Sequence, residues 1–344
     1  MAAPITDPRE HVLATILGHD NLKRLLRAMI AADRLPRALL LHGHAGVGKR
    51  SLAYALVKFL NHSPEGDQAG CTLAACRKIP RGTYLDLIEI APSGAGGQIR
   101  VESAHEAEAR LATAPIEGRR KVLLIHEAHR MNVATANALL KMIEEPPRDA
   151  LTVLVTDRPA ALLPTIRSRC SALRCGAVEH EALAAWLLEH VAALKGDRDL
   201  ARFLALLAEG RPGQALALIG TGLLDQRGEA VGALVEFHRE GYRAFMKTAW
   251  RLAQGGEGLG GALALLFTWY RDLLVTRIAP DDAGLLLNAD QAEALRQAAA
   301  KMPVAGLVAA LEQIARRFAM ADRIANTQLV LESLLVDVGM ATKK

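Results

Sequence analysis

The sequence predicts an α/β domain built on a parallel sheet, followed by a region made only of helices. Four short apolar runs alternate with helical patterns in the first half of the chain: 39–42, 85–90, 121–125 and 151–156. The run 121–125 is apolar enough for burial on both faces, as in a parallel sheet. From residue 178 onward, apolar residues recur at the spacing of helices, which indicates separate helical domains.

The composition agrees with this division. Ala and Leu dominate a sequence that is 51% hydrophobic but only 4% aromatic, which favours helices over β-sandwiches. No apolar run approaches the ~18 residues of a membrane span, and the charged N-terminus lacks the apolar core of a signal peptide. Four cysteines in 344 residues are typical of a reduced, cytoplasmic protein.

Helices are expected along the chain before the first predicted strand and between the later ones. Residues 9–34 predict two helices separated at Gly18, the second ending before Pro36 because residues before proline avoid the α region. Further helices are expected in three stretches, with 61–83 irregular: 51–60, 101–111 and 132–143. Beyond these, helices are predicted over these ranges: 183–194, 199–208, 214–220, 232–253, 261–277, 290–301, 305–321 and 327–340.

A glycine-rich loop follows the first predicted strand and has the G-x-x-x-x-G-K spacing of a phosphate-binding loop. In such loops the backbone N–H groups cradle phosphate oxygens and the lysine reaches the β/γ-phosphates. The residues expected to do so are these: Gly43, Gly46, Gly48 and Lys49. The next position should be a Ser or Thr that holds Mg²⁺, but it is Arg50. Ser51 comes one residue late, about 100° around the following helix.

The second metal position of this type of site has also changed. The strand 121–125 ends in His126 and Glu127, where P-loop ATPases place an Asp-Glu pair. Imidazole is a poor partner for Mg²⁺, which prefers carboxylate and water oxygens. We therefore expect a nucleotide-binding fold with impaired or absent hydrolysis, and leave open whether ATP still binds. A competing interpretation makes His126 and His129 a metal-binding pair.

Cysteines in the segment 61–83 raise the question of zinc. Cys71 and Cys76, even with His62, fall short of a four-ligand set at the usual C-x₂₋₄-C spacing. We expect no zinc site and two free thiols.

Six short motifs make the sequence resemble the clamp-loader subunits of bacterial DNA polymerase III, which belong to the AAA+ superfamily. The motifs are Arg34-Leu35-Pro36, Tyr84-Leu85-Asp86, Ala114-Pro115-x-Glu117-Gly118, Asn137-Ala138-Leu139-Leu140-Lys141, Glu144-Glu145-Pro146-Pro147 and Ile166-Arg167-Ser168-Arg169-Cys170. The resemblance implies an AAA+ domain over 1–177, a helical lid over 178–224 and a helical collar over 225–344 through which subunits form a ring.

The resemblance also implies roles for two residues outside the loop. Arg169 of the Ser-Arg-Cys motif would reach the γ-phosphate bound by a neighbouring subunit, and Thr156 would be sensor-like. A planar guanidinium supplied in trans stabilises the charge of phosphoryl transfer. From its position after the strand 151–156, we expect Arg169 at the rim of the carboxyl edge of the sheet. The alternative is an arginine in a surface ion pair.

The departures from the family pattern favour its delta-prime subunits over the ATPase subunits, gamma/tau. ATPase subunits keep both metal ligands, four cysteines after the phosphate loop and an arginine in the lid where this chain has Gly213. The resemblance implies gamma/tau and delta subunits, the sliding clamp and primer-template DNA as partners. The alternatives are a working AAA+ ATPase and, less favoured by the net charge of +5 and few aromatics, a DNA-binding module.

Overall fold

The computed structural model describes residues 12–61, 74–94, 96–194, 196–220, 223–240, 242–253, 258–318 and 326–342. The chain forms two compact units. The first is Met1–Ala182 with Arg211–Gly213, and the second is Leu183–Gly210 with Gln214–Lys344. The finer division into three domains, with boundaries at 177 and 224, stays a prediction.

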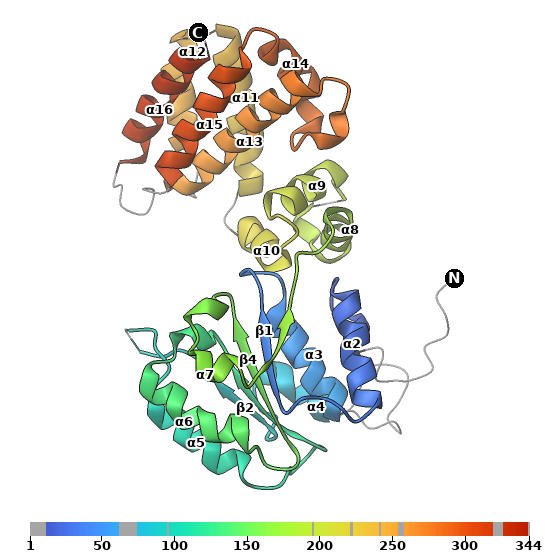
Figure 1. Ribbon diagram of the computed structural model, residues 1–344. Coiled ribbons are helices and arrows are strands. Elements are labelled where there is room, and N and C mark those ends of the chain that lie inside the picture. The colour runs from blue at the N-terminus through green and yellow to red at the C-terminus, as the bar shows by residue number, and fades with distance from the viewer. Residues whose placement is uncertain are drawn as a thin grey trace, which may run out of the picture. The chain divides into compact units, whose positions relative to one another are not determined.

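A five-stranded parallel sheet forms the centre of the first unit (Figure 1). Its order is β2-β3-β4-β1-β5, and every pairing is parallel. The strands are β1 (Ala38–His42), β2 (Leu87–Ile90), β3 (Lys121–Ile125), β4 (Ala150–Thr156) and β5 (Ser171–Arg174). The four predicted strands and their parallel arrangement are confirmed. The fifth strand was not predicted, because only Leu173 of its four residues is buried and no apolar run marks it.

Helices cover both faces of this sheet. Leu39 and Leu41 of β1 face one core, and Leu40 between them faces the other, because successive side chains of a strand point to opposite faces. The first core is shared with α2 (Asp20–Ala31), α3 (Lys49–Asn61) and α4 (Ala74–Lys78), and the second with α5 (Val101–Leu111), α6 (Val133–Glu144) and α7 (Pro164–Arg167). The sheet is therefore the middle layer of three.

Two details of the first unit differ from the sequence prediction. The second strand begins at Leu87 rather than at residue 85. Asp86, directly before it, is fully buried, and its carboxylate accepts backbone hydrogen bonds from Ile116, Glu117 and Gly118. The segment predicted to be irregular contains α4 and the 3₁₀ turn η1 (Ile79–Arg81), and residues 62–73 of that segment lie outside the described residues.

The second unit is helical, as predicted. Two of its helices begin in the first unit: α8 (His180–His190) and α10 (Pro212–Gly220). The others are α9 (Arg198–Leu207), α11 (Leu223–Glu240), α12 (Tyr242–Ala253), α13 (Gly258–Ile278), α14 (Ala292–Ala299), α15 (Val304–Phe318) and α16 (Thr327–Ala341). The single helix predicted over 232–253 is instead the pair α11 and α12. None of the described helices combines the length and the apolar character needed to cross a bilayer.

Contacts within the second unit join the predicted lid to the predicted collar. Arg202 of α9 donates a hydrogen bond to the carbonyl oxygen of Gly284 at 2.7 Å. Arg227 of α11 lies 4.7 Å from the centre of the Phe203 ring, and its Nη2 also forms an ion pair with Asp290 at 2.6 Å. These contacts explain why residues 183–210 form one compact unit with the helices that follow.

Candidate functional site

The phosphate-loop residues lie between the carboxyl end of β1 and the first turn of α3, as predicted. Gly43, Gly46 and Gly48 have φ values of 149°, 82° and 96°, which residues with a side chain rarely adopt. A Cβ on Gly43 would lie 2.1 Å from the carbonyl oxygen of Cys175, so only glycine fits there. The backbone thus has the shape of a phosphate cradle at a helix N-terminus.

Lys49 closes this loop on itself. Its ammonium group donates hydrogen bonds to the carbonyl oxygens of Gly43 and His44, both at 2.7 Å, and the residue is buried. Burial lowers the pKa of Lys49, and the nearby Asp157 opposes part of that change. The lysine is therefore positioned over the loop, where a phosphate group would compete with the two carbonyls for it.

The two positions that lack a metal ligand are joined by a hydrogen-bonded chain. Arg50 donates from Nε to the hydroxyl oxygen of Tyr54 at 2.9 Å, and its guanidinium lies 5.3 Å from the centre of that ring. Tyr54 donates to Oε1 of Glu89 at 2.6 Å, and the same oxygen lies 2.7 Å from Nε2 of His126. Burial and the Glu89 hydrogen bond raise the pKa of Tyr54. We call Arg50, Tyr54, Glu89 and His126 the Tyr54 network.

The Tyr54 network was not predicted from the sequence as a unit. One signal was available, because Arg50 and Tyr54 are four residues apart and so lie on the same side of α3. Glu89 comes from β2, and only the strand order brings it beside the end of β3. Glu89 is the one carboxylate of the network, and its Oε1 forms hydrogen bonds with both Tyr54 and His126.

The remaining residues after β3 have partners of their own. Glu127 has a φ of 44°, and its carboxylate forms an ion pair with Nε of Arg130 at 2.6 Å. Nδ1 of His129 lies 3.1 Å from the hydroxyl of Thr156 and 3.2 Å from the carboxylate of Asp157. His126 and His129 thus contact different carboxylates. Over the described parts of the chain, no three His, Cys, Asp or Glu residues form a cluster that could hold a metal ion.

Thr156 and Gly213 both lie near the phosphate loop. Thr156 ends β4 opposite His42 of β1, and its hydroxyl accepts the backbone N–H of Arg158. Gly213, which belongs to the first unit, donates its backbone N–H to the carbonyl oxygen of Gly46 at 2.8 Å. A Cβ at 213 would lie 3.0 Å from the Cα of Gly46, so a side chain there requires the loop to shift.

Arg169 lies at the amino ends of the strands, opposite the carboxyl ends where the phosphate loop lies. Ser171 starts β5 and pairs in parallel with Leu39 near the start of β1, so Arg169 is at the amino edge. Our expectation that it lies at the carboxyl edge is wrong, because the chain returns from the end of β4 through α7 to begin a strand that was not predicted. The phosphate loop follows the carboxyl end of β1. One sheet therefore separates Arg169 from the loop of its own chain.

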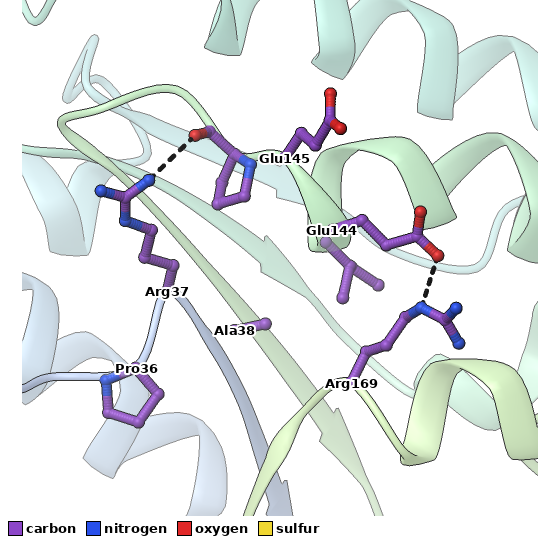
Figure 2. A pocket seen from close by; sticks show the side chains of 8 residues that line it. Pro36, Arg37, Ala38, Glu144, Glu145 and Arg169 are labelled. Atoms are coloured by element: carbon purple, nitrogen blue, oxygen red, sulfur yellow. Dashed lines mark hydrogen bonds and ion pairs between the residues drawn. The ribbon is translucent and has the colours of Figure 1, made fainter.

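A pocket of about 450 Å³ opens beside Arg169 (Figure 2). It is lined by Pro36, Arg37, Ala38, Ile143, Glu144, Glu145, Pro146 and Arg169. Nε of Arg169 forms an ion pair with Oε1 of Glu144, and Nη1 donates to the carbonyl oxygen of Thr165 at 3.1 Å. The Arg169 side chain is 42% exposed, so it remains accessible to a partner. The ion pair that we considered as an alternative is present, and it leaves part of the guanidinium accessible.

Cys76, the one described residue of the candidate zinc set, lies in α4 and packs against the core on the α2–α3 face of the sheet. Cys71 and His62 lie outside the described residues. The expectation of no zinc site stays a prediction.

The central parallel sheet, the phosphate loop after β1 and the helical second unit define a P-loop protein of the AAA+ class. Two family models match the sequence: "DNA polymerase III, delta subunit" over residues 18–179, and "DNA polymerase III, delta subunit, C terminal" over residues 221–339. The chain is 32% identical to DNA polymerase III subunit delta' of Pseudomonas aeruginosa over 308 residues, covering 87% of this chain and 90% of that protein. The chain therefore belongs to the DNA polymerase III clamp-loader family, in its delta-prime branch.

Other relatives are similar over smaller parts or at lower identity. The chain is 33% identical to DNA polymerase III subunit tau of Escherichia coli over 225 residues, which are 64% of this chain and 34% of that protein. A gamma subunit-related protein of Thermotoga maritima aligns with 94% of this chain and 100% of its own, at 21% identity and a TM-score of 0.42. The assignment rests on the sequence matches.

Proposed function

We propose that this chain is a clamp-loader subunit that does not hydrolyse ATP itself and instead supplies Arg169 to the ATP site of a neighbouring ATPase subunit. The observation that carries the proposal is the Tyr54 network. Both positions that would hold Mg²⁺ are part of it, and they carry a guanidinium and an imidazole in place of oxygen ligands. Mg²⁺ requires near-octahedral oxygen coordination, and P-loop hydrolysis depends on the metal to neutralise charge on the phosphates.

The position of Arg169 supports a role in trans. Its own phosphate loop is at the other edge of the sheet, so the arginine has no route to a phosphate bound in the same chain. The guanidinium is partly exposed beside a pocket, in a place where a second subunit can reach it. A planar fork of N–H donors that is always charged suits the developing charge on a transferred phosphoryl group.

The partners follow from the family. We propose that the chain assembles with gamma/tau and delta subunits, and that the assembled complex opens the sliding clamp and loads it on primer-template DNA in the cytoplasm. The relatives include both delta' and tau proteins, which supports association among subunits of this kind. Apolar side chains exposed on the helices of the predicted collar are consistent with partner contacts there: Met246, Trp250, Leu329 and Met340.

Two measurements test this proposal together. The purified chain is assayed alone for ATP hydrolysis with Mg²⁺, and it is co-expressed with gamma/tau and delta subunits to test for a stable complex. We expect no measurable turnover alone and co-purification of all subunits in fixed ratio. Metal-dependent turnover on the order of 1 s⁻¹ by the isolated chain would support the alternative, a working ATPase. The gamma/tau subunit alone is the positive control for hydrolysis.

A further inference from the structure

We infer that Glu144 is a positioning residue for Arg169, which holds the guanidinium by its Nε side and leaves its outer edge free for a phosphate. This inference rests on the proposed function. The trans role of Arg169 does not by itself require its ion pair with Glu144 at the end of α6, and a positioning role explains why that ion pair is present.

The hydrogen-bond inventory of Arg169 shows which donors remain available. A guanidinium carries five N–H donors: one on Nε and two on each terminal nitrogen. Glu144 takes the donor on Nε, and the carbonyl oxygen of Thr165 takes one donor on Nη1. In Figure 2 the dashed line from Glu144 ends at Nε and not at either of the two terminal nitrogens. The donors suited to a bidentate phosphate contact are therefore unoccupied by Glu144.

Both anchors of the guanidinium come from well-packed elements. Glu144 is the last residue of α6, directly after the buried residues Met142 and Ile143. Thr165 belongs to α7, which is fixed to the same core by the fully buried Ile166. An arginine side chain has many rotamers. Because Glu144 and Thr165 already hold the Arg169 guanidinium, less side-chain ordering remains when the neighbouring subunit's phosphate binds.

The contact geometry distinguishes a positioning role from an inhibitory one. A carboxylate that blocked the finger would pair with the terminal nitrogens, as in a bidentate Arg–carboxylate pair. Glu144 instead contacts Nε, so the pair can persist while a phosphate is bound. The adjacent Glu145 points away from Arg169 (Figure 2). Both members of the pair are partly exposed, at 42% and 44%, so its loss should leave the fold intact.

The test uses the complete clamp-loader complex and measures kcat and KM of DNA-stimulated ATP hydrolysis. We expect Glu144→Ala to lower kcat several-fold, with the KM for ATP unchanged, because the neighbouring subunit still binds its nucleotide. Glu144→Gln should retain most of the activity, since its amide oxygen can accept the same hydrogen bond. In an Arg169→Ala background, Glu144→Ala should have no further effect. The control is Glu293→Ala, which removes an ion pair with Arg296 on α14 whose Arg and Glu side chains are 53% and 71% exposed.

The outcomes separate this inference from the proposed function. Full activity or a gain of activity in Glu144→Ala, while Arg169→Ala is impaired, would overturn the positioning role and leave the trans role of Arg169 standing. An equal loss from Glu144→Ala with and without Arg169 would assign Glu144 to assembly or folding, and would also overturn it. Full activity of Arg169→Ala itself would overturn both proposals at once.

Discussion

Tyr54 donates its phenolic hydrogen to Glu89 across 2.6 Å and thereby links helix α3 to strand β2. The link completes a chain of contacts from Arg50 to His126, the two positions at which a P-loop ATPase holds its metal. Arg50 and His126, which replace the two expected metal ligands, thus belong to one hydrogen-bonded network. A single substitution would break the network without rebuilding a metal site.

We predict that the double variant Arg50→Thr with His126→Asp does not restore ATP hydrolysis. The two changes return the expected ligand types, but Glu89 and Tyr54 remain beside the site. Gly213 also still provides no side chain where the family pattern of the ATPase subunits has an arginine. Turnover is measured on the isolated variant with excess Mg²⁺, and the wild-type chain is the control. Turnover on the order of 1 s⁻¹ would show that the two ligands alone were missing.

A second prediction concerns nucleotide binding. ATP bound at this loop should have the same affinity with Mg²⁺ as with a chelator, because Arg50 and His126 replace the metal ligands. Lys49→Ala should weaken binding roughly tenfold or more, the cost of one charge-assisted hydrogen bond. Equilibrium dialysis with labelled ATP measures both effects. An affinity that depends strongly on Mg²⁺ would contradict the prediction, and no binding at millimolar ATP would show that the loop is vestigial.

Much of this site could be predicted from the sequence, because its spacing is local. Gly43 to Lys49 are consecutive in the chain, and the missing ligands at Arg50 and His126 follow from a motif read residue by residue. Glu89 could not be assigned in this way, since its role depends on which strand pairs with β3. Likewise, the contact between Gly213 and Gly46 joins residues far apart in the sequence.

Asp86 provides a prediction about stability. Its buried carboxylate accepts three backbone hydrogen bonds, from Ile116 at 2.8 Å, Glu117 at 2.6 Å and Gly118 at 2.7 Å. Asp86→Ala leaves these donors without their acceptor, so we expect a loss of roughly 3 kcal/mol or more in the free energy of unfolding. Denaturant unfolding followed by circular dichroism measures the loss.

The control for Asp86 is Asp33→Asn, which neutralises a carboxylate that is 92% exposed and pairs with Arg120 at 3.4 Å. Asparagine tolerates the φ of 52° at this position, so the change adds no backbone strain. That change should alter the free energy of unfolding by about 0.5 kcal/mol or less. Similar losses in the two variants would mean that the hydrogen bonds to Asp86 do not hold the segment before β3.

The second unit should lose stability in mild acid through His238. Its Nε2 atom is buried without a partner among the described residues, 5.5 Å separates the centres of the His238 and Tyr270 rings, and burial lowers the pKa of His238 to about 4. The unfolded chain has a His pKa of about 6.5, so between these values it binds more protons than the folded state. Stability therefore falls as the pH falls through this window, by at most about 3 kcal/mol.

The variant His238→Phe isolates this contribution. Thermal unfolding is compared at about pH 7 and about pH 4.5, and the variant should lose less Tm than the wild-type chain between the two. Replacement of the exposed His105 by Gln serves as the control and should leave the difference unchanged. An equal loss of Tm in His238→Phe and the wild-type chain would show that His238 titrates normally.

The fold was predictable where apolar runs are long, and less so where they are short. β1, β3 and β4 are buried along most of their length, and each is visible as an apolar run. β5 is short, only Leu173 of its residues is buried, and its existence follows from pairing with β1. Because β5 was not predicted, Arg169 was expected at the carboxyl ends of the strands. The chain in fact crosses back to the amino ends before β5 begins, and Arg169 lies there.

Arg169 is proposed to act on a phosphate bound by another subunit. The most direct measurement is DNA-stimulated ATP hydrolysis by the complete complex containing Arg169→Ala, beside a complex containing Arg167→Ala. Arg167 is an exposed arginine two positions earlier and serves as the matched control. Both complexes should assemble normally, because an exposed ion pair adds little to stability.

We expect the rate to fall several-fold or more in Arg169→Ala, with a residual rate from the other ATP sites, and to stay unchanged in Arg167→Ala. Arg169→Lys should recover little, because a point charge does not reproduce the fork of donors. Full ATP hydrolysis by an assembled Arg169→Ala complex would contradict the account.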